Sequence, residues 1–252
     1  MNSVLEKAIV LHRRPYRETS LLIELLTQNH GRIALVAKGA RKSKSLAGLL
    51  QPFQTLLVSW LGKGELFTLT HAESLDWKAK LQGTQLYCAL YLNELLLRCL
   101  QKNHPQPDLF ELYLRTLDDL SCCSEAMVLR KFEWNFMEIL GYGIDVLHDF
   151  QGEEIDAESC YYYEQHAGFV KTESSHHLSI LGLDLLNFEQ GDWDVIATQN
   201  LARKILQPAM QHLIGDKPFA SRILYQSLKN QKIQRTQRSE LNKRESHDDN
   251  HT

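Results

Sequence analysis

Short apolar runs separated by turn residues fill roughly the first 75 residues of this chain. Five runs are rich in Val, Ile, Leu and Phe and lack a long helical period, which indicates strands. They cover residues 4–12, 20–27, 32–38, 53–61 and 65–73. Turn-forming residues separate them at Pro15, Asn29-His30-Gly31, Gly39, Gln51-Pro52 and Gly62-Lys63-Gly64. The last of these is expected to close a tight hairpin.

Five short antiparallel strands close most economically as a Greek-key barrel of the OB type, because closure removes the exposed strand edges. An SH3-like barrel is the main alternative.

Helical patterns begin at about Thr84. Residues 86–97 are apolar almost all round and too long for a strand, which indicates a buried helix. A second helix is predicted over 108–120. A third is predicted from the N-cap residue Ser124 to a stop at 141–143, with one apolar stripe made of Leu129, Phe132, Phe136 and Ile139 or Leu140. We expect the three helices to pack as a bundle.

The second half of the chain is less regular. Residues 144–190 are acidic, with possible strand pieces at 160–163 and 168–170, which predicts a small β excursion. A helix resumes near Asp194, and Pro208 is expected to kink or end it. A last helix is predicted to contain Ile223, Leu224 and Leu228.

The expected fold class is therefore α+β, with a five-stranded OB-type barrel followed by helices and a small irregular β excursion. We divide the chain into an OB-fold domain (1–80), a helical domain (81–230) that includes the acidic excursion 145–194, and a polar tail (231–252). The tail has almost no apolar residues and is predicted to be disordered.

The composition, with 43% hydrophobic residues, is that of a globular protein. No stretch approaches 18 uninterrupted apolar residues, and the start lacks the pattern of a signal peptide, so we expect a cytoplasmic protein. The five cysteines form no CxxC pair, which argues against a disulfide framework and a thiolate zinc site. We expect no metal and no other cofactor.

Charge is segregated along the chain. Residues 1–80 hold 12 Lys and Arg against 6 Asp and Glu, whereas residues 145–194 hold one Lys against 12 acids. Residues 203–244 are again basic, with ten Lys and Arg against two acids. Segregated fields of this kind indicate a charged partner.

The turn after the third predicted strand is the strongest local signal. It places four cations within seven residues, beside a glycine that gives the backbone freedom: Lys38, Arg41, Lys42 and Lys44, with Gly39. Cations held in this way suit a phosphate backbone, because each neutralised phosphate releases a counterion. Further cations are expected at the same end of the barrel, namely Arg13, Arg14, Arg17 and Arg32. A solvated charged loop is the alternative interpretation.

Aromatic residues of the barrel could stack on bases of a single strand. The candidates are Tyr16, Phe53, Trp60 and Phe67. Phe53 and Phe67 lie inside apolar runs and are expected to pack in the core, so Tyr16, beside Arg14 and Arg17, is the strongest stacking candidate.

The chain carries no GxSxG, HExxH or Walker motif and no spaced acids typical of a two-metal nuclease, so no catalytic residue is predicted. Asn93 and Glu94 interrupt an apolar helix and must find hydrogen-bond partners if they are buried, which favours a structural role. On the third predicted helix, Arg130 and Trp134 are four residues apart and opposite the apolar stripe, with Lys131 adjacent. A cation beside an exposed aromatic suits a short acidic and apolar peptide.

Short motifs lie in a fixed order along the chain. In the barrel region they are Leu11-His12, Pro15, Glu18-Thr19-Ser20, Gly31-Arg32, residues 35–41 and Gln51-Pro52-Phe53. In the helical region they are Leu86-Tyr87, residues 91–95, 129–133 and 140–143, and Gly215-x-Lys217-Pro218-x-x-Ser221-Arg222. Together, over roughly residues 4–225, they closely resemble the bacterial recombination mediator family RecO.

The resemblance implies an OB-fold domain, a helical domain and no covalent catalysis. Members of the family bind single- and double-stranded DNA, anneal strands covered by single-strand-binding protein, and work with RecR to load RecA. They also dock the acidic, Phe-ended tail of single-strand-binding protein, and Arg130 matches a family position used for that tail. The predicted peptide site is therefore Arg130, Lys131 and Trp134. The predicted DNA-binding residues are Arg13, Arg14, Arg32, Lys38, Arg41, Lys42, Lys44, Lys217 and Arg222.

Two departures from the family pattern matter. Some relatives carry a four-cysteine zinc finger in the second half, but only Cys160 lies in the corresponding excursion. Ala220 stands where a lysine is common, which weakens the basic patch near Lys217. The alternatives to a mediator are a nuclease-like enzyme that uses an OB domain to capture nucleic acid, and an RNA-binding or scaffolding module.

Overall fold

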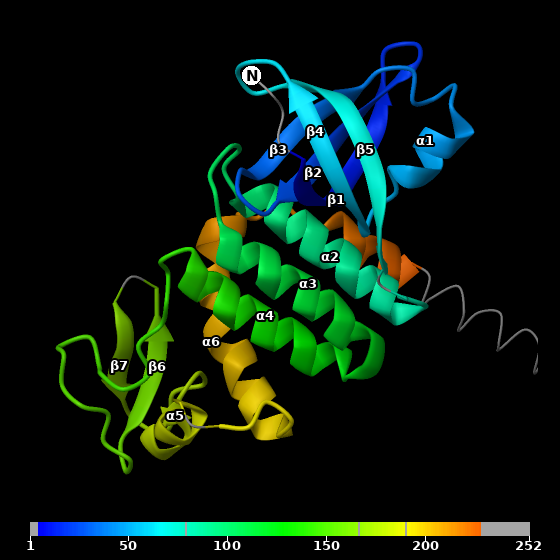
Figure 1. Ribbon diagram of the computed structural model, residues 1–252. Helices are drawn as coiled ribbons and strands as arrows, with labels where there is room; N and C mark the ends of the chain where they lie inside the picture. Colours follow the sequence, from blue (N-terminus) through cyan, green and yellow to red (C-terminus); the bar gives the residue numbers. More distant parts are fainter. Residues whose placement is uncertain (1–4, 79, 166, 190, 228–252) are drawn as a thin grey trace, which may run out of the picture.

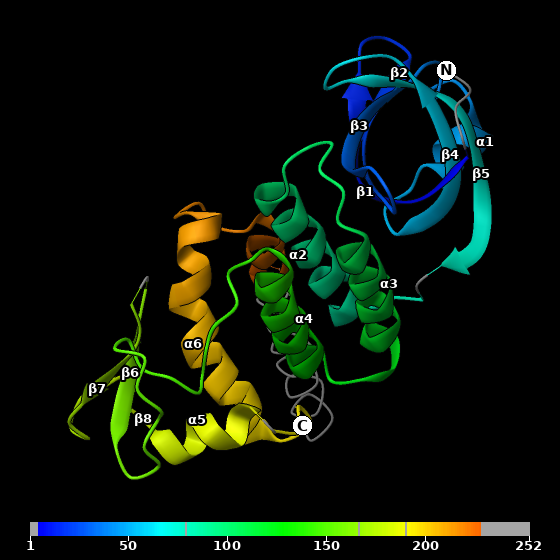
Figure 2. The ribbon, with the colours of Figure 1, turned by 60° about the vertical axis from the view of Figure 1, so that its left-hand side comes forward.

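The structure is a computed structural model that describes residues 5–78, 80–165, 167–189 and 191–227. It has three parts: an N-terminal β-barrel, a central set of helices and a small sheet (Figure 1). The barrel and the small sheet lie at opposite ends of the molecule, with the helices between them (Figures 1 and 2). The expected α+β class, with a five-stranded barrel ahead of the helices, is confirmed.

Five strands close the barrel in the order β1-β2-β3-β5-β4. They are β1 (Glu6–Tyr16), β2 (Ser20–Thr27), β3 (Gly31–Ala37), β4 (Gln54–Leu61) and β5 (Phe67–Lys78). Buried apolar side chains such as Ile23, Leu35 and Val58 fill the interior. Neighbouring strands are antiparallel except for β3 and β5, which are parallel. An all-antiparallel barrel was the wrong expectation, because strand directions cannot alternate all the way around a closed ring of five.

Pro15 lies inside β1, opposite Leu21 of β2, and does not separate two strands as predicted. The reason is the pairing of β1, which contacts β4 only over residues 6–9. Beyond that segment one side of β1 is an open edge, where a residue without an N–H group is tolerated.

Two connections of the barrel differ from the prediction. A short helix, α1 (Lys44–Leu49), lies between β3 and β4, and the Ser43 hydroxyl caps it by accepting a hydrogen bond from the Leu46 amide at 3.2 Å. Lys44 is therefore the first residue of a helix. The β4–β5 hairpin has a five-residue connection over residues 62–66 in place of a tight turn.

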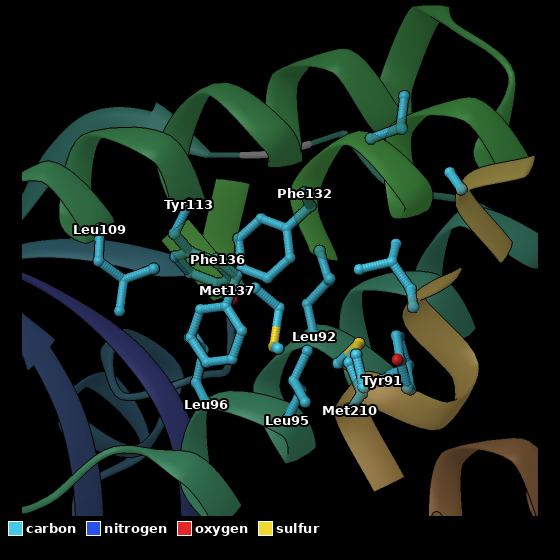
Figure 3. Packing of buried hydrophobic residues seen from close by; sticks show 14 of the residues in the cluster. Tyr91, Leu92, Leu95, Leu96, Leu109, Tyr113, Phe132, Phe136, Met137 and Met210 are labelled. Atoms are coloured by element: carbon cyan, nitrogen blue, oxygen red, sulfur yellow. The ribbon is translucent and has the colours of Figure 1, made fainter. Parts of the chain in front are cut away.

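Four helices form the centre of the molecule, namely α2 (Thr84–Cys99), α3 (Pro107–Cys122), α4 (Glu125–Ile139) and α6 (Ile196–Ile214). Their shared core is apolar and aromatic (Figure 3). Phe132 and Phe136 of the predicted α4 stripe are fully buried there, with nearly parallel rings whose centroids are 5.6 Å apart, whereas Leu129 is half-buried. The three predicted helices of the bundle are present close to their expected bounds.

Pro208 does not end the last long helix, because α6 runs continuously through it to Ile214. The chain then turns at Gly215 and forms a further helical segment over residues 220–227. This segment contains Ile223 and Leu224 as predicted. Leu228 and the predicted disordered tail 231–252 lie outside the described residues.

The acidic excursion forms a three-stranded sheet with the order β7-β6-β8. Its strands are β6 (Cys160–Glu164), β7 (Gly168–Thr172) and β8 (Ile180–Leu181), and a helix that was not predicted, α5 (Gly182–Glu189), follows them. Tyr161 and Phe169 are buried beneath this sheet against the helical core. The sheet lies on the side of the helices away from the barrel, so the acidic segment does not cover the basic barrel (Figure 2).

The barrel is joined to the helices by buried polar contacts. The Asn93 amide of α2 donates to the Leu11 carbonyl of β1 at 2.6 Å, and the Tyr113 hydroxyl of α3 donates to the Asn93 side-chain oxygen. The structural role expected of Asn93 is thus supported by its partners on two elements. The loop after α2 also meets β3, where the Asn103 amide donates to the Arg32 carbonyl at 2.8 Å.

Gly31 makes this junction possible. Its φ is +67°, and a Cβ at this position would lie 1.9 Å from the His104 carbonyl oxygen. A side chain there would therefore require both a left-handed backbone and the displacement of the loop that joins the barrel to the helices.

We predict that Gly31→Ala lowers the free energy of unfolding by at least about 3 kcal/mol, because strain and a backbone clash add. Gly39→Ala is the matched control, since Gly39 has φ +71° but a Cβ added there would meet nothing within 4 Å. Strain alone should cost the control about 1–2 kcal/mol. Urea unfolding measures both, and equal losses would contradict the role of the close approach.

Candidate nucleic-acid interface and peptide groove

Two turns meet at one end of the barrel, namely the turn between β1 and β2 and the turn after β3. The Arg41 amide donates to the Thr19 carbonyl at 2.9 Å, and the Arg41 guanidinium donates to the Arg17 and Glu18 carbonyls at 3.1 and 2.9 Å. These bonds hold the turn after β3 against the turn between β1 and β2. Cations from separate parts of the sequence are thereby fixed on one surface.

We call this surface the basic end. Its members are exposed and form no salt bridge within the described part of the chain: Arg14, Arg17, Lys38, Arg41, Lys42 and Lys44. Arg13 lies beside them but is half-buried, and its guanidinium donates to the Ala47 carbonyl of α1 at 2.7 Å. Exposed cations on and beside two adjoining turns form a surface that can follow a phosphate backbone.

Arg32 does not lie at the basic end, contrary to the prediction. It is at the opposite end of β3, where its guanidinium pairs with Glu24 at 3.0 Å and donates to the Leu97 and Leu100 carbonyls of α2 and its C-cap. Its side chain is only 15% exposed. Arg32 therefore supplies hydrogen bonds to carbonyl groups at the C-terminal end of α2, and its side chain has little freedom to contact DNA.

The four aromatic residues considered for base stacking also lie in different parts of the structure. Trp60 and Phe67 pack against each other, with centroids 6.3 Å apart, and His30 lies against Trp60 at the barrel end opposite the basic one. Phe53 is buried in the helical core. Only Tyr16 adjoins the basic end, with the Arg17 guanidinium 5.3 Å from the centre of its ring.

Lys217 and Arg222 belong to a segment that is tied to α2. Glu94 accepts hydrogen bonds from the Ala220 and Ser221 amides at 3.0 and 3.1 Å and thereby caps the helical segment 220–227. Although burial raises the pKa of the Glu94 carboxyl, the bonds from Ser221, Ala220 and Arg98 outweigh it and hold this pKa below its ordinary value. The Lys217 side chain is exposed, and Arg222 projects toward Tyr91, 5.1 Å from its ring centre.

Two cavities of about 370 and 560 Å³ adjoin one another between α2, α4, α6 and the segment 220–227. We call them together the arginine groove. The residues that line both are Tyr91, Ala126, Leu129, Arg130 and Arg222. The smaller cavity continues over Tyr87, Cys88 and Tyr225, and the larger one over Glu133, Arg203 and Met210. The groove thus combines cations with apolar walls.

Glu133 lies at the base of the groove with no exposed surface. The Arg130 guanidinium pairs with its Oε2 at 2.5 Å, and the Tyr91 hydroxyl donates to its Oε1 at 2.6 Å. Burial raises the pKa of the Glu133 carboxyl above its ordinary value, although Arg130 and Tyr91 oppose the shift. Burial and the Glu133 charge raise the pKa of Tyr91 well above its usual range, so this hydroxyl stays a donor.

The three residues predicted to bind a peptide do not form one exposed surface. Arg130 lines the arginine groove, whereas Lys131 is exposed beside the separate cavity between α3 and α4. Trp134 is not an exposed aromatic, because its ring packs against Phe188 of α5 at 4.7 Å and near Trp193 at 6.4 Å. Arg222, which we predicted to bind DNA, is the second cation of the groove. Helical spacing located Arg130 but could not show which distant segments cover its neighbours.

Neither a metal site nor a membrane segment emerges from the described residues. They contain no group of three or more His, Cys, Asp or Glu that could hold a metal ion. None of their helices has the length and apolar content needed to cross a membrane.

Comparison with known proteins identifies relatives along nearly the whole chain. The family described as Recombination protein O N terminal matches residues 1–77, and Recombination protein O C terminal matches residues 81–222. A DNA repair protein RecO from Haemophilus influenzae is 42% identical over 228 residues, covering 89% of this chain and 97% of the relative. One from Nitrosospira multiformis is 43% identical over 225 residues, covering 87% and 93%. The chain therefore belongs to the RecO family of DNA repair proteins.

Proposed function

We propose that this protein binds single- and double-stranded DNA through the basic end, anneals complementary strands, and helps to load RecA on DNA coated by single-strand-binding protein. In this role it acts without catalysing a covalent step and works together with RecR. The observation that carries the proposal is the basic end itself, which holds six exposed cations on and beside two turns that are bonded to each other.

Annealing by such a surface is electrostatic. Two complementary strands repel each other through their phosphates, and a protein that neutralises part of both charges lowers that repulsion. Contacts to phosphates fix position but do not read sequence, which suits a protein that must act on any gap. The acidic sheet lies away from the basic end and leaves it open to both strands (Figure 1).

Replacing Lys38, Arg41, Lys42 and Lys44 together with Ala should weaken DNA binding at least about tenfold at about 100 mM salt and flatten its dependence on salt concentration. Fluorescence anisotropy of labelled single and double strands measures both effects. Lys63→Ala with Lys80→Ala is the control, because these lysines are exposed and lie outside the basic end. Unchanged affinity in the fourfold variant would favour a scaffolding role, and tighter binding of RNA than of DNA would favour an RNA-binding one.

The nuclease-like alternative has its own test. Labelled DNA incubated with the protein and Mg²⁺ or Mn²⁺ should stay intact, while complementary strands coated with single-strand-binding protein should anneal faster. Specific cleavage would contradict the mediator role.

We further propose that the arginine groove docks the acidic, Phe-ended tail of single-strand-binding protein. Arg130 and Arg222 can receive carboxylates, while Tyr87, Leu129 and Tyr225 offer apolar walls to an aromatic side chain. Burial, and to a lesser degree Glu125, raises the pKa of the Cys88 thiol to about 11, so it lines the groove as a neutral group. We therefore propose the arginine groove as the peptide-binding site, in place of the surface of Arg130, Lys131 and Trp134 that the sequence predicted.

Arg130→Ala and Arg222→Ala should each weaken binding of a labelled tail peptide about tenfold or more, because each removes one cation from the groove. Binding of naked DNA should change less than about twofold. Arg115→Ala is the control, since Arg115 is an exposed arginine beside the separate α3–α4 cavity. Equal losses of peptide and DNA binding would contradict this division between the two surfaces.

A further inference from the structure

We propose that Glu133 determines the specificity of the arginine groove, because it partly neutralises the groove from below and so disfavours nucleic acid while still permitting a peptide. The inference rests on the proposed docking of a peptide in this groove. It concerns a residue that contacts no ligand itself and acts through Arg130.

The larger cavity of the groove would otherwise be lined by cations without a carboxylate. Arg130, Arg203 and Arg222 line it, and Glu133 is the carboxylate among its lining residues. Three guanidinium groups around one cavity would form a phosphate-binding surface. A buried carboxylate weakens this field strongly, since charges interact more strongly where water is excluded.

Glu133 is placed to act on the field without blocking the groove. It has no exposed surface, so a ligand meets Arg130 and Tyr91 before it meets the carboxylate. Arg130 is 20% exposed and uses one guanidinium nitrogen on Glu133, which leaves further N–H groups for a ligand. The ion pair with Glu133 therefore both orients the Arg130 guanidinium and lowers its effective positive charge.

A peptide tolerates the weaker field better than DNA does. Its apolar side chain can be buried against Leu129, Tyr87 and Tyr225, and that burial supplies binding free energy independent of charge. A phosphate backbone depends mainly on its cations. Weakening the charge thus lowers DNA affinity more than peptide affinity, which separates the groove from the basic end.

The same arrangement makes the groove sensitive to pH. Because burial raises the pKa of Glu133, acidification neutralises this carboxyl and increases the positive charge of the groove. The charged and titratable groups that face it are Tyr91 of α2, Arg130 of α4, Arg203 of α6 and Arg222 of the segment 220–227. Arginines keep their charge, and Tyr91 stays neutral because its pKa is raised. DNA binding by the groove should therefore increase as pH falls.

The test uses the full chain with Lys38, Arg41, Lys42 and Lys44 replaced by Ala, so that the basic end contributes less to the remaining DNA binding and the share of the groove is larger. In this parent, Glu133→Gln should increase the affinity for a labelled oligothymidylate about fivefold or more and increase the affinity for the tail peptide less. Glutamine can still accept a hydrogen bond from Arg130 and donate one to Tyr91. Glu138→Gln is the matched control, an exposed glutamate of the same helix that should change neither affinity.

Anisotropy titrations from neutral pH downward complete the test. The parent should bind the oligonucleotide more tightly at low pH, whereas Glu133→Gln should show a weaker dependence. Equal affinities of parent and Glu133→Gln, or equal gains for peptide and oligonucleotide, would overturn the proposal. If Glu133→Gln does not fold, the parent is tested instead. Its increase in oligonucleotide affinity at low pH must then disappear when Arg130 and Arg222 are replaced by Ala. Absence of any peptide binding would instead reject the proposed docking, and the oligonucleotide measurements would still test Glu133.

Discussion

Three polar side chains of α2, which point in different directions, hold the parts of this molecule together. The Asn93 amide donates a hydrogen bond to the Leu11 carbonyl of the barrel, and Glu94 caps the helical segment that carries Arg222. Tyr91, on the same helix, donates to Glu133 of α4. Each of these side chains lies in an otherwise apolar helix, so each must be paired when it is buried. The need to satisfy them fixes where the barrel and the C-terminal segment lie on the bundle.

Pairing also decides which cations are available to a partner. Arg32 and Arg98 donate to backbone carbonyls and carboxylates, and they hold elements in place. The six cations of the basic end form no salt bridge among the described residues. Arg130 is intermediate, because it is paired with Glu133 yet lines a cavity. An arginine can thus be paired and structural, unpaired and exposed, or paired and still accessible to a ligand. Sequence position alone does not distinguish these three cases, although each has a different consequence for binding.

Local patterns predicted the elements well and the long-range partners poorly. Strand β2 has its predicted bounds, since apolar runs and turn residues act within a few positions. Arg32 could not be assigned correctly, because the Leu97 carbonyl that it contacts lies 65 residues further along the chain. Trp134 lies on the predicted helix but is covered by Phe188, on a helix that the sequence pattern did not reveal. The basic end was predictable because its cations cluster within two short stretches of sequence, residues 14–17 and 38–44.

The basic and acidic blocks of the sequence are also separated in space. The acidic excursion forms the end of the molecule opposite the barrel, so the two fields do not cancel locally (Figures 1 and 2). A polyanion is attracted to one end and repelled from the other, which orients the protein before contact. The arginine groove lies on the bundle between these ends and is lined by residues of α2, α4, α6 and the segment 220–227. The buried carboxylate beneath Arg130 is surrounded there by three guanidinium groups, so a change in its charge alters the field that a ligand meets.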